Sequence, residues 1–337
     1  MILANNSYEN NDFLVEVDTT TASEIETQPI VWFYPPFIPI GTVSILLGDG
    51  GDGKSFYSLA LATAISRGQP LPGMPEALLP PSDVIVMNGE NPWASVIKPR
   101  LEMLGADCTK IHRINDNGQR LTLTDNRIEA AIRKHRARLT IIDPMQSFLS
   151  ENFSMNRAES VRPALMHLEK VAERTESAIL VLGHISKGRG KAQHRGLGSV
   201  DIVNSVPSVL VLGKAEGLDS DVRAIAHMKS NFEELGATHL FRLNKAIGFK
   251  WEGEDDSITP DDIMRFNASK AREDKTKLAE AVEFLEELLA YGEVPAAEAI
   301  EMADEEEISK RTLDRAKKKI GVKPRKVDGH WLWALPE

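Results

Sequence analysis

Short apolar runs alternate with stretches of helical periodicity through the middle of the chain. Each run is four or five residues long, and they lie at 43–47, 84–87, 139–142, 178–182 and 208–212. Parallel strands that are buried on both faces have this composition, because helices cover both sides of the sheet. The pattern predicts an α/β domain whose mostly parallel sheet is flanked by helices.

The pattern changes on both sides of this core. Residues 1–29 are polar and without periodicity, which indicates a flexible leader. Prolines and aromatic residues cluster at 31–39, where they exclude a helix interior and favour a collar packed on the core. After residue 222 the strand-like segments come closer together, which indicates antiparallel strands that extend the sheet.

The C-terminal sequence predicts a small separate module. Leu278, Val282, Leu285 and Leu289 recur at helical spacing, and a second helix is expected near 295–303. Ser309 can cap a third helix that ends at Gly321, and Asp328-Gly329 is a hairpin-turn signal. Three short helices followed by a hairpin are the layout of a winged helix-turn-helix. The predicted parts are a leader (1–29), the α/β domain (30–252), a linker (253–276) and the winged module (277–337).

Composition bounds the class of protein. A length of 337 residues suggests about two domains, and 42% hydrophobic with 27% charged residues is typical of a globular chain. Because no apolar run reaches the ~18 residues that span a bilayer, we expect a cytoplasmic protein with no membrane partner. Cys108 is the only cysteine, so neither an internal disulfide nor a cysteine-based zinc site is expected.

The clearest motif is Gly-Asp-Gly-Gly-Asp-Gly-Lys-Ser at 48–55, which matches G-x-x-x-x-G-K-[ST] between a predicted strand and helix. Such a loop turns backbone N–H groups toward phosphates. Lys54 is expected to contact the β- and γ-phosphates and Ser55 to hold Mg²⁺, so ATP and Mg²⁺ are the predicted cofactors. Asp49 and Asp52 are expected to weaken nucleotide binding unless they point outward. The alternative for the whole loop is a glycine-rich turn without a ligand. The predicted nucleotide-binding residues are Gly48, Gly50, Gly51, Asp52, Gly53, Lys54, Ser55 and Phe56.

Three further polar residues follow predicted strands, whose carboxyl ends meet at one edge of a parallel sheet. Asp143 is expected to bind the metal, although a turn residue is the alternative. Glu90 is expected to be the general base rather than a surface glutamate. His184 is expected to sense the γ-phosphate, with a structural histidine as the alternative.

The order of these motifs resembles the RecA-like hexameric ATPases of the DnaB superfamily and, within it, the RepA-like helicases of plasmids and mobile elements. The resemblance covers about residues 30–250, and its other motifs lie at 88–92, 99–107, 141–144, 183–187, 195–199 and 229–231. It implies a RecA-like core, Mg²⁺-dependent ATP hydrolysis and a homo-oligomeric ring, with a hexamer favoured and each nucleotide between two subunits.

One departure from that family concerns the residue that acts across subunits. DnaB-like relatives have a Lys-x-Arg hairpin, whereas this chain has Lys229-Ser230-Asn231. Lys229 is still expected to act in trans, and Arg223 or Arg195 is the candidate arginine finger, unless these are surface or packing residues. Without a finger, hydrolysis is expected to be slow, because a finger contributes roughly a thousandfold or more in rate.

Two basic regions are expected to bind DNA although the net charge is −10. The loop 187–195 holds four basic residues among glycines. In the ring that the resemblance implies, this loop and the loop 147–157 would face the central channel. A flexible basic loop suits the phosphate backbone of single-stranded DNA. Residues 309–326 hold nine basic residues against one acidic, which suits duplex DNA. The alternatives are solvated surfaces or a protein-docking module, and Trp331 and Trp333 are expected to be buried. The predicted contacts are Lys187, Arg189, Lys191, Arg195, Lys310, Arg311, Arg315 and Lys318.

Three functions remain open from the sequence. The first is an ATP-driven ring motor on DNA, a RepA-like helicase in the replication of a plasmid, phage or mobile element. The second is a RecA-like ATPase that regulates or loads other proteins on DNA without unwinding. The third is a nucleotide-gated scaffold without useful catalysis.

Overall fold

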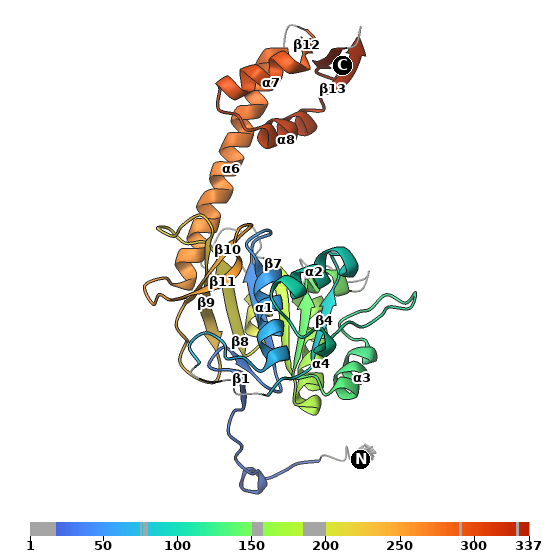
Figure 1. Ribbon diagram of the computed structural model, residues 1–337, viewed down its shortest axis with the longest axis vertical. Coiled ribbons are helices and arrows are strands. Elements are labelled where there is room, and N and C mark those ends of the chain that lie inside the picture. The colour runs from blue at the N-terminus through green and yellow to red at the C-terminus, as the bar shows by residue number, and fades with distance from the viewer. Residues whose placement is uncertain are drawn as a thin grey trace, which may run out of the picture.

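The computed structural model describes residues 18–74, 76, 80–149, 158–184, 200–289, 292–327 and 330–336 (Figure 1). In this part of the chain the largest feature is a nine-stranded sheet in the order β11-β10-β9-β8-β3-β7-β6-β4-β5. Its strands are β3 (Val43–Gly48), β4 (Val84–Asn88), β5 (Ile111–His112), β6 (Leu139–Asp143), β7 (Ala178–His184), β8 (Ser208–Gly213), β9 (Val222–Ser230), β10 (His239–Asn244) and β11 (Gly248–Glu254).

Strand direction confirms the predicted fold class. The strands from β8 through β3, β7, β6 and β4 to β5 are parallel. β9, β10 and β11 then extend the sheet in antiparallel fashion from β8. A mostly parallel sheet of this order with a phosphate-type loop after β3 is a RecA-like α/β fold.

Helices cover both faces of the sheet, which explains why every residue of β3, β6 and β8 is buried. One apolar cluster joins α1 (Lys54–Arg67) and α2 (Lys98–Met103) to the sheet, and another joins α3 (Asn126–His135), α4 (Ala158–Thr175) and α5 (Val200–Asn204) to its opposite face. None of the helices in the described ranges has the length and apolar character needed to cross a bilayer.

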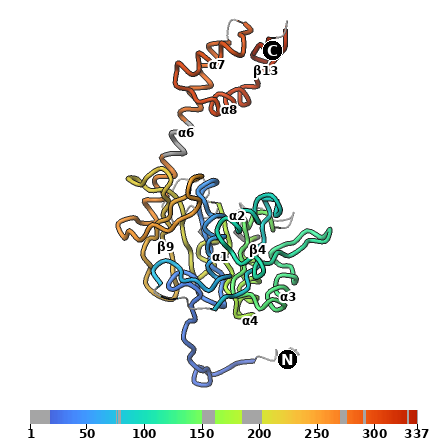
Figure 2. The backbone as a smooth tube through the Cα atoms, viewed as in Figure 1, coloured from blue at the N-terminus to red at the C-terminus, as the bar shows by residue number. Residues whose placement is uncertain are grey.

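The proline- and aromatic-rich segment forms the predicted collar. Its strands β1 (Trp32–Tyr34) and β2 (Ile38–Pro39) pair with each other, and Phe33, Tyr34 and Phe37 are buried in the core. The Tyr34 hydroxyl lies 2.6 Å from Nδ1 of His239 on β10, so the collar is tied to the antiparallel part of the sheet. Before the collar, residues 18–30 run away from the body (Figure 2).

The predicted linker is largely helical. α6 (Pro260–Leu289) is one helix of 30 residues that includes most of the polar stretch 253–276 (Figure 1). Ile263 and Met264 in its first turns pack into the core of the α/β domain, whereas Leu285 and Leu289 near its end pack with the C-terminal elements. Helix α6 therefore belongs to both cores, and the predicted domain boundaries stay predictions.

The C-terminal elements follow the predicted order of helices and hairpin. They are β12 (Val294–Pro295), α7 (Ala296–Glu305), α8 (Lys310–Ile320), β13 (Lys323–Val327) and β14 (His330–Ala334). Ser309 caps α8 by accepting a hydrogen bond from the Thr312 N–H, and Gly321 ends the helix at φ 72°. The hairpin strands β13 and β14 pair in antiparallel fashion, while the predicted turn at 328–329 lies outside the described residues.

Candidate nucleotide-binding site

The glycine-rich loop between β3 and α1 requires its glycines for backbone reasons. Gly51 and Gly53 have φ values of 88° and 101°, in the region that favours glycine. A Cβ on Gly48 would lie 2.5 Å from the carbonyl oxygen of Leu212 on β8. The loop can therefore bend sharply at the sheet edge and present its backbone N–H groups, as phosphate binding requires.

Lys54 lies under this loop. Its side chain is buried, and Nζ donates hydrogen bonds to the carbonyl oxygens of Gly48 (2.7 Å) and Asp49 (2.8 Å). Burial lowers the pKa of Lys54, and the negative charge of Asp52 opposes that shift. Nζ also lies 3.4 Å from Nδ1 of His184 at the end of β7, so two of the predicted residues meet at the sheet edge.

Asp143 and Ser55 form an oxygen-rich pair that suits Mg²⁺. Asp143 ends β6 and is buried, and its carboxylate accepts hydrogen bonds from Ser55 and from Nδ2 of Asn88 (3.3 Å). Burial raises the pKa of Asp143, whereas the Ser55 hydrogen bond lowers it. Hydroxyl and carboxylate oxygens are the ligand types that Mg²⁺ prefers, so these two residues fit the predicted metal site.

Glu90 lies on a loop whose backbone is held in place. The Asn88 side-chain oxygen accepts hydrogen bonds from the N–H groups of Glu90 (3.3 Å) and Asn91 (2.7 Å). Gly89 passes so close to the turn at Met145–Phe148 that a Cβ would lie 2.2 Å from Ser147 Cβ. The Glu90 carboxylate lies 3.9 Å from Nε2 of His184, at the same edge as Lys54 and Asp143.

Asp52 does not point outward. Its side chain is only 9% exposed, and its Oδ2 lies 3.5 Å from Nδ2 of Asn267, a buried residue of α6. The Asp52 charge also acts on Arg223 and Lys54. The reason is tertiary: α6 packs over the end of β8 beside the loop, so the acidic side chain is turned toward protein. Nothing in the local sequence around Asn267 indicates this contact.

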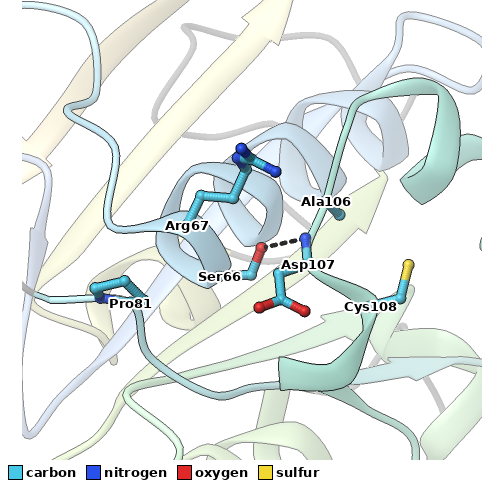
Figure 3. Close-up of a pocket in the computed structure, with 6 residues that line it drawn as sticks. All are labelled: Ser66, Arg67, Pro81, Ala106, Asp107 and Cys108. Atoms are coloured by element: carbon cyan, nitrogen blue, oxygen red, sulfur yellow. Dashed lines mark hydrogen bonds between the residues drawn. The ribbon is translucent and has the colours of Figure 1, made fainter.

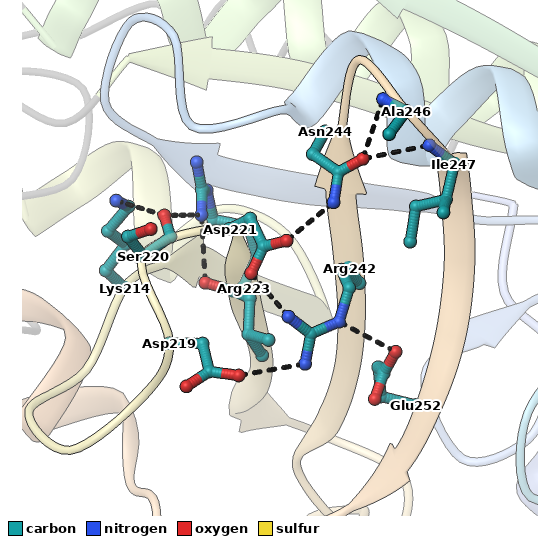
Figure 4. A network of polar contacts seen from close by, with 11 residues as sticks. Lys214, Asp219, Ser220, Asp221, Arg223, Arg242, Asn244, Ala246, Ile247 and Glu252 are labelled. Carbon is teal, nitrogen blue, oxygen red and sulfur yellow. Dashed lines mark hydrogen bonds and ion pairs between the residues drawn. The ribbon is translucent and has the colours of Figure 1, made fainter.

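Arg223 lies near the start of β9, in the antiparallel extension of the sheet (Figure 4). Its Nη1 donates to the carbonyl oxygens of Ser220 (2.9 Å) and Val222 (2.9 Å), while its buried Nε has no hydrogen-bond partner among the described residues. Burial lowers the pKa of Arg223. Its neighbour Arg242 is instead held by the carboxylates of Asp219, Asp221 and Glu252.

Lys229 is engaged within its own chain. Its Nζ donates to the carbonyl oxygens of Val203 (3.2 Å), Asn204 (3.1 Å) and Val206 (2.7 Å), at the C-terminal end of α5. An ammonium group has three protons, so this arrangement uses all of them. In the described chain Lys229 therefore fastens α5 to β9, and its action in trans stays a prediction.

The structure places only some of the predicted DNA contacts. Lys310, Arg311, Arg315 and Lys318 are all exposed on α8. The loop 187–195 with Lys187, Arg189, Lys191 and Arg195, and the loop residues 150–157, lie outside the described residues. Trp333 is buried as expected, but Trp331 is 52% exposed, because it lies near the end of the hairpin beyond the apolar cluster of the module.

Two pockets lie outside the phosphate loop. One of about 490 Å³ is lined by Ser66, Arg67 and Cys108 and lies at the opposite end of α1 from Lys54 (Figure 3). Another of about 520 Å³ adjoins Asn88 and Gly89. Phe56 follows the motif and is a predicted nucleotide contact. The guanidinium carbon of Arg100 lies 4.6 Å from the centroid of its ring, and the sequence does not indicate this contact.

Comparison with known proteins agrees with this geometry. A family model described as an AAA domain matches residues 12–190, slightly more than half of the chain. The matched range includes the glycine-rich loop, Glu90, Asp143 and His184. No curated protein matches the chain.

Proposed function

Since this chain belongs to the AAA-domain family of P-loop ATPases, we propose that it is a ring-forming motor that hydrolyses ATP on DNA. Its role would be that of a RepA-like helicase in the replication of a plasmid, phage or mobile element. The observation that carries the proposal is the convergence of Lys54, Ser55, Asp143, Glu90 and His184 at one sheet edge.

Each of these side chains has a task that follows from its position. Lys54 emerges beneath the loop and would neutralise the β- and γ-phosphates, while Ser55 and Asp143 would hold Mg²⁺, whose charge offsets that of the departing phosphate. Glu90 is more exposed than Asp143 and would take the proton from the attacking water. His184 contacts both Lys54 and Glu90, which suits a residue that responds to the γ-phosphate.

The C-terminal module supports a DNA substrate. Exposed basic residues lie along α8, and Lys323, Arg325 and Lys326 on β13 are also exposed. A basic helix and a basic hairpin on one small module suit the phosphate backbone of duplex DNA and a winged helix-turn-helix mode of docking. Trp331, with the Lys326 ammonium 5.8 Å from its ring centroid, adds an exposed aromatic group to this hairpin.

A second function is favoured by the residues that were expected to act on the ATP of a neighbouring subunit. Lys229 is engaged by its own chain, and Asn231 stands where the related ATPases have an arginine. A motor without an arginine finger hydrolyses slowly, which would suit an ATPase that loads or regulates other proteins on DNA without unwinding. Arg223 is the remaining described candidate for the arginine finger. The helicase requires such a finger for fast hydrolysis, whereas the loading or regulatory ATPase does not.

The deciding experiment is strand displacement on forked DNA by the full chain with ATP and Mg²⁺. The helicase proposal predicts displacement that is abolished in Lys54→Ala and kept in the control Lys98→Ala, whose side chain is exposed on α2. DNA-stimulated ATP hydrolysis with no displacement on any fork would select the loading or regulatory function. Mass measurement with ATP and DNA tests the ring, since a strict monomer under all conditions contradicts it.

A further inference from the structure

Two histidines and an aspartate meet at the end of the sheet opposite to the nucleotide site. Asp83 directly precedes β4, His112 is the last residue of the neighbouring strand β5, and His135 is the last residue of α3. Because β4 carries Asn88 at its other end, a full strand length separates this group from Asp143 and Glu90. The ATPase site does not use these three side chains.

The three side chains are already in contact. Nε2 of His112 lies 2.7 Å from Oδ1 of Asp83, and the His112 and His135 rings stack with centroids 3.7 Å apart. All three are half-buried, and their ligand atoms lie within 4.8 Å of one another.

We propose that Asp83, His112 and His135 form a zinc site. Two imidazoles and one carboxylate are a ligand set that zinc accepts, with water as the fourth ligand, and imidazole selects transition metals over Mg²⁺. The half-buried position leaves room for that water. Zinc–ligand bonds of about 2.0–2.2 Å place ligand atoms about 3.3–3.6 Å apart. The ligand atoms lie within 4.8 Å of one another here, so they must come somewhat closer together to share one ion.

Binding requires two local changes. The ring planes, now 20° apart, must tilt further so that a lone pair of each ring points at one ion. Lys110, whose Nζ lies 3.5 Å from Oδ2 of Asp83, must turn toward water because its charge opposes that of the ion. Lys110 is partly exposed on a short turn, so this movement needs no rearrangement of the strands.

The consequence of binding is structural. The ligands come from the start of β4, from the short edge strand β5 and from the end of α3, so an ion would join three elements at the sheet edge. β5 has two residues and pairs only with β4 in the described sheet, which makes it the strand that gains most. Zinc that binds the folded chain in preference to the unfolded chain raises the melting temperature as its concentration rises.

The test is a zinc titration of the full chain after chelator treatment, in competition with a chromophoric chelator and with excess Mg²⁺ present. The expected result is one zinc per chain, and at least about tenfold weaker binding in Asp83→Asn, His112→Asn and His135→Asn. His330→Asn and Cys108→Ser are the controls, and both are expected to bind as the unchanged chain does. Co²⁺ in place of zinc is expected to give the absorption of a tetrahedral site.

Two results would overturn the zinc site. One is binding by the unchanged chain that is no tighter than in the variant with all three substitutions. The other is binding that disappears in His330→Asn or Cys108→Ser. If the triple variant does not fold, the Co²⁺ spectrum of the unchanged chain decides, because a chain without the site gives only the spectrum of octahedral aqueous Co²⁺.

Discussion

At the scale of single residues, Glu90 and Glu102 are both exposed glutamates, yet their surroundings differ. Glu102 pairs with Lys98 on the same helix, whereas Glu90 faces His184 at the nucleotide site. We expect Glu90→Gln to keep ATP binding and to reduce hydrolysis by about a hundredfold or more, because the amide cannot accept a proton from water. Nucleotide affinity and turnover check this, with Glu102→Gln as the control, and unchanged turnover in Glu90→Gln would remove the base assignment.

Glu169 on α4 gives a prediction that depends on pH. Burial raises the pKa of Glu169 to about 7 from an ordinary value of 4.5, while its carboxylate accepts a hydrogen bond from the Val43 N–H (2.8 Å). The folded state therefore holds this proton more tightly than the unfolded state does, so the carboxyl costs stability as pH rises from 4.5 through 7.

The matching experiment is Glu169→Gln, which keeps the acceptor for Val43. We expect its free energy of unfolding at pH 8 to exceed that of the unchanged chain by about 1–2 kcal/mol, after allowance for partial exposure. Below the ordinary pKa the two chains should be equally stable. Denaturant unfolding at both pH values measures this, with exposed Glu286→Gln as the control; an equal stability at pH 8 would contradict the raised pKa.

At the scale of elements, α6 is the helix whose packing matters most for the site. A Cβ on Gly213 would lie 2.7 Å from Ile263 and 3.0 Å from Asn267, so the glycine at the end of β8 allows α6 to approach. Asn267 then reaches Asp52 of the phosphate loop. The same helix continues to the C-terminal module. A movement of the phosphate loop would therefore act directly on α6 through the contact between Asp52 and Asn267.

This contact predicts the effect of Asn267→Ala. Removing one partner of the buried Asp52 carboxylate should lower the free energy of unfolding by about 1 kcal/mol, because the 3.5 Å contact is long for a hydrogen bond. Urea unfolding measures the decrease. Ser269→Ala, on an exposed position of the same helix, is the control and should leave stability unchanged. A stability equal to that of the control would mean that Asn267 does not stabilise the loop.

At the scale of the whole molecule, charge is divided between an acidic body and a basic tail. The net charge is −10, while residues 309–326 alone hold nine basic residues against one acidic. The logarithm of DNA affinity falls as the logarithm of salt concentration rises. If α8 binds DNA phosphates, replacing Arg311, Arg315 and Lys318 by Ala should make this negative slope less steep. The decrease should be about 1 for each phosphate that is no longer neutralised.

Fluorescence anisotropy of labelled duplex DNA at several salt concentrations measures that slope. The control is an alanine triple on exposed positions of α3 and α4, at Lys134, Arg162 and Lys170, which should leave the slope unchanged. Equal slopes for both triples would exclude α8 as the DNA-binding helix and leave a protein-docking or merely solvated helix. Hydrolysis without DNA should be the same in both, since neither triple lies at the sheet edge with Lys54.

Local patterns in the sequence determined most of the fold and the principal site. Apolar runs of four or five residues between helical stretches are typical of strands buried on both faces, and the spacing of the glycines, lysine and serine from Gly48 to Ser55 is typical of a phosphate-binding loop. Parallel strands then bring Glu90, Asp143 and His184 together at one edge, because their carboxyl ends share it. The C-terminal helices and hairpin followed from capping residues and periodicity for the same reason: each depends on neighbours within a few residues.

The tertiary structure alone decided the contacts between residues far apart in the chain. It made most of the polar stretch before residue 277 helical, turned Asp52 toward Asn267, and engaged Lys229 with the end of α5. It also joined Asp83, His112 and His135, whose spacing along the chain matches no metal motif. Polar side chains in such contacts leave no periodic signal, since their partners come from packing between elements and not from the local sequence.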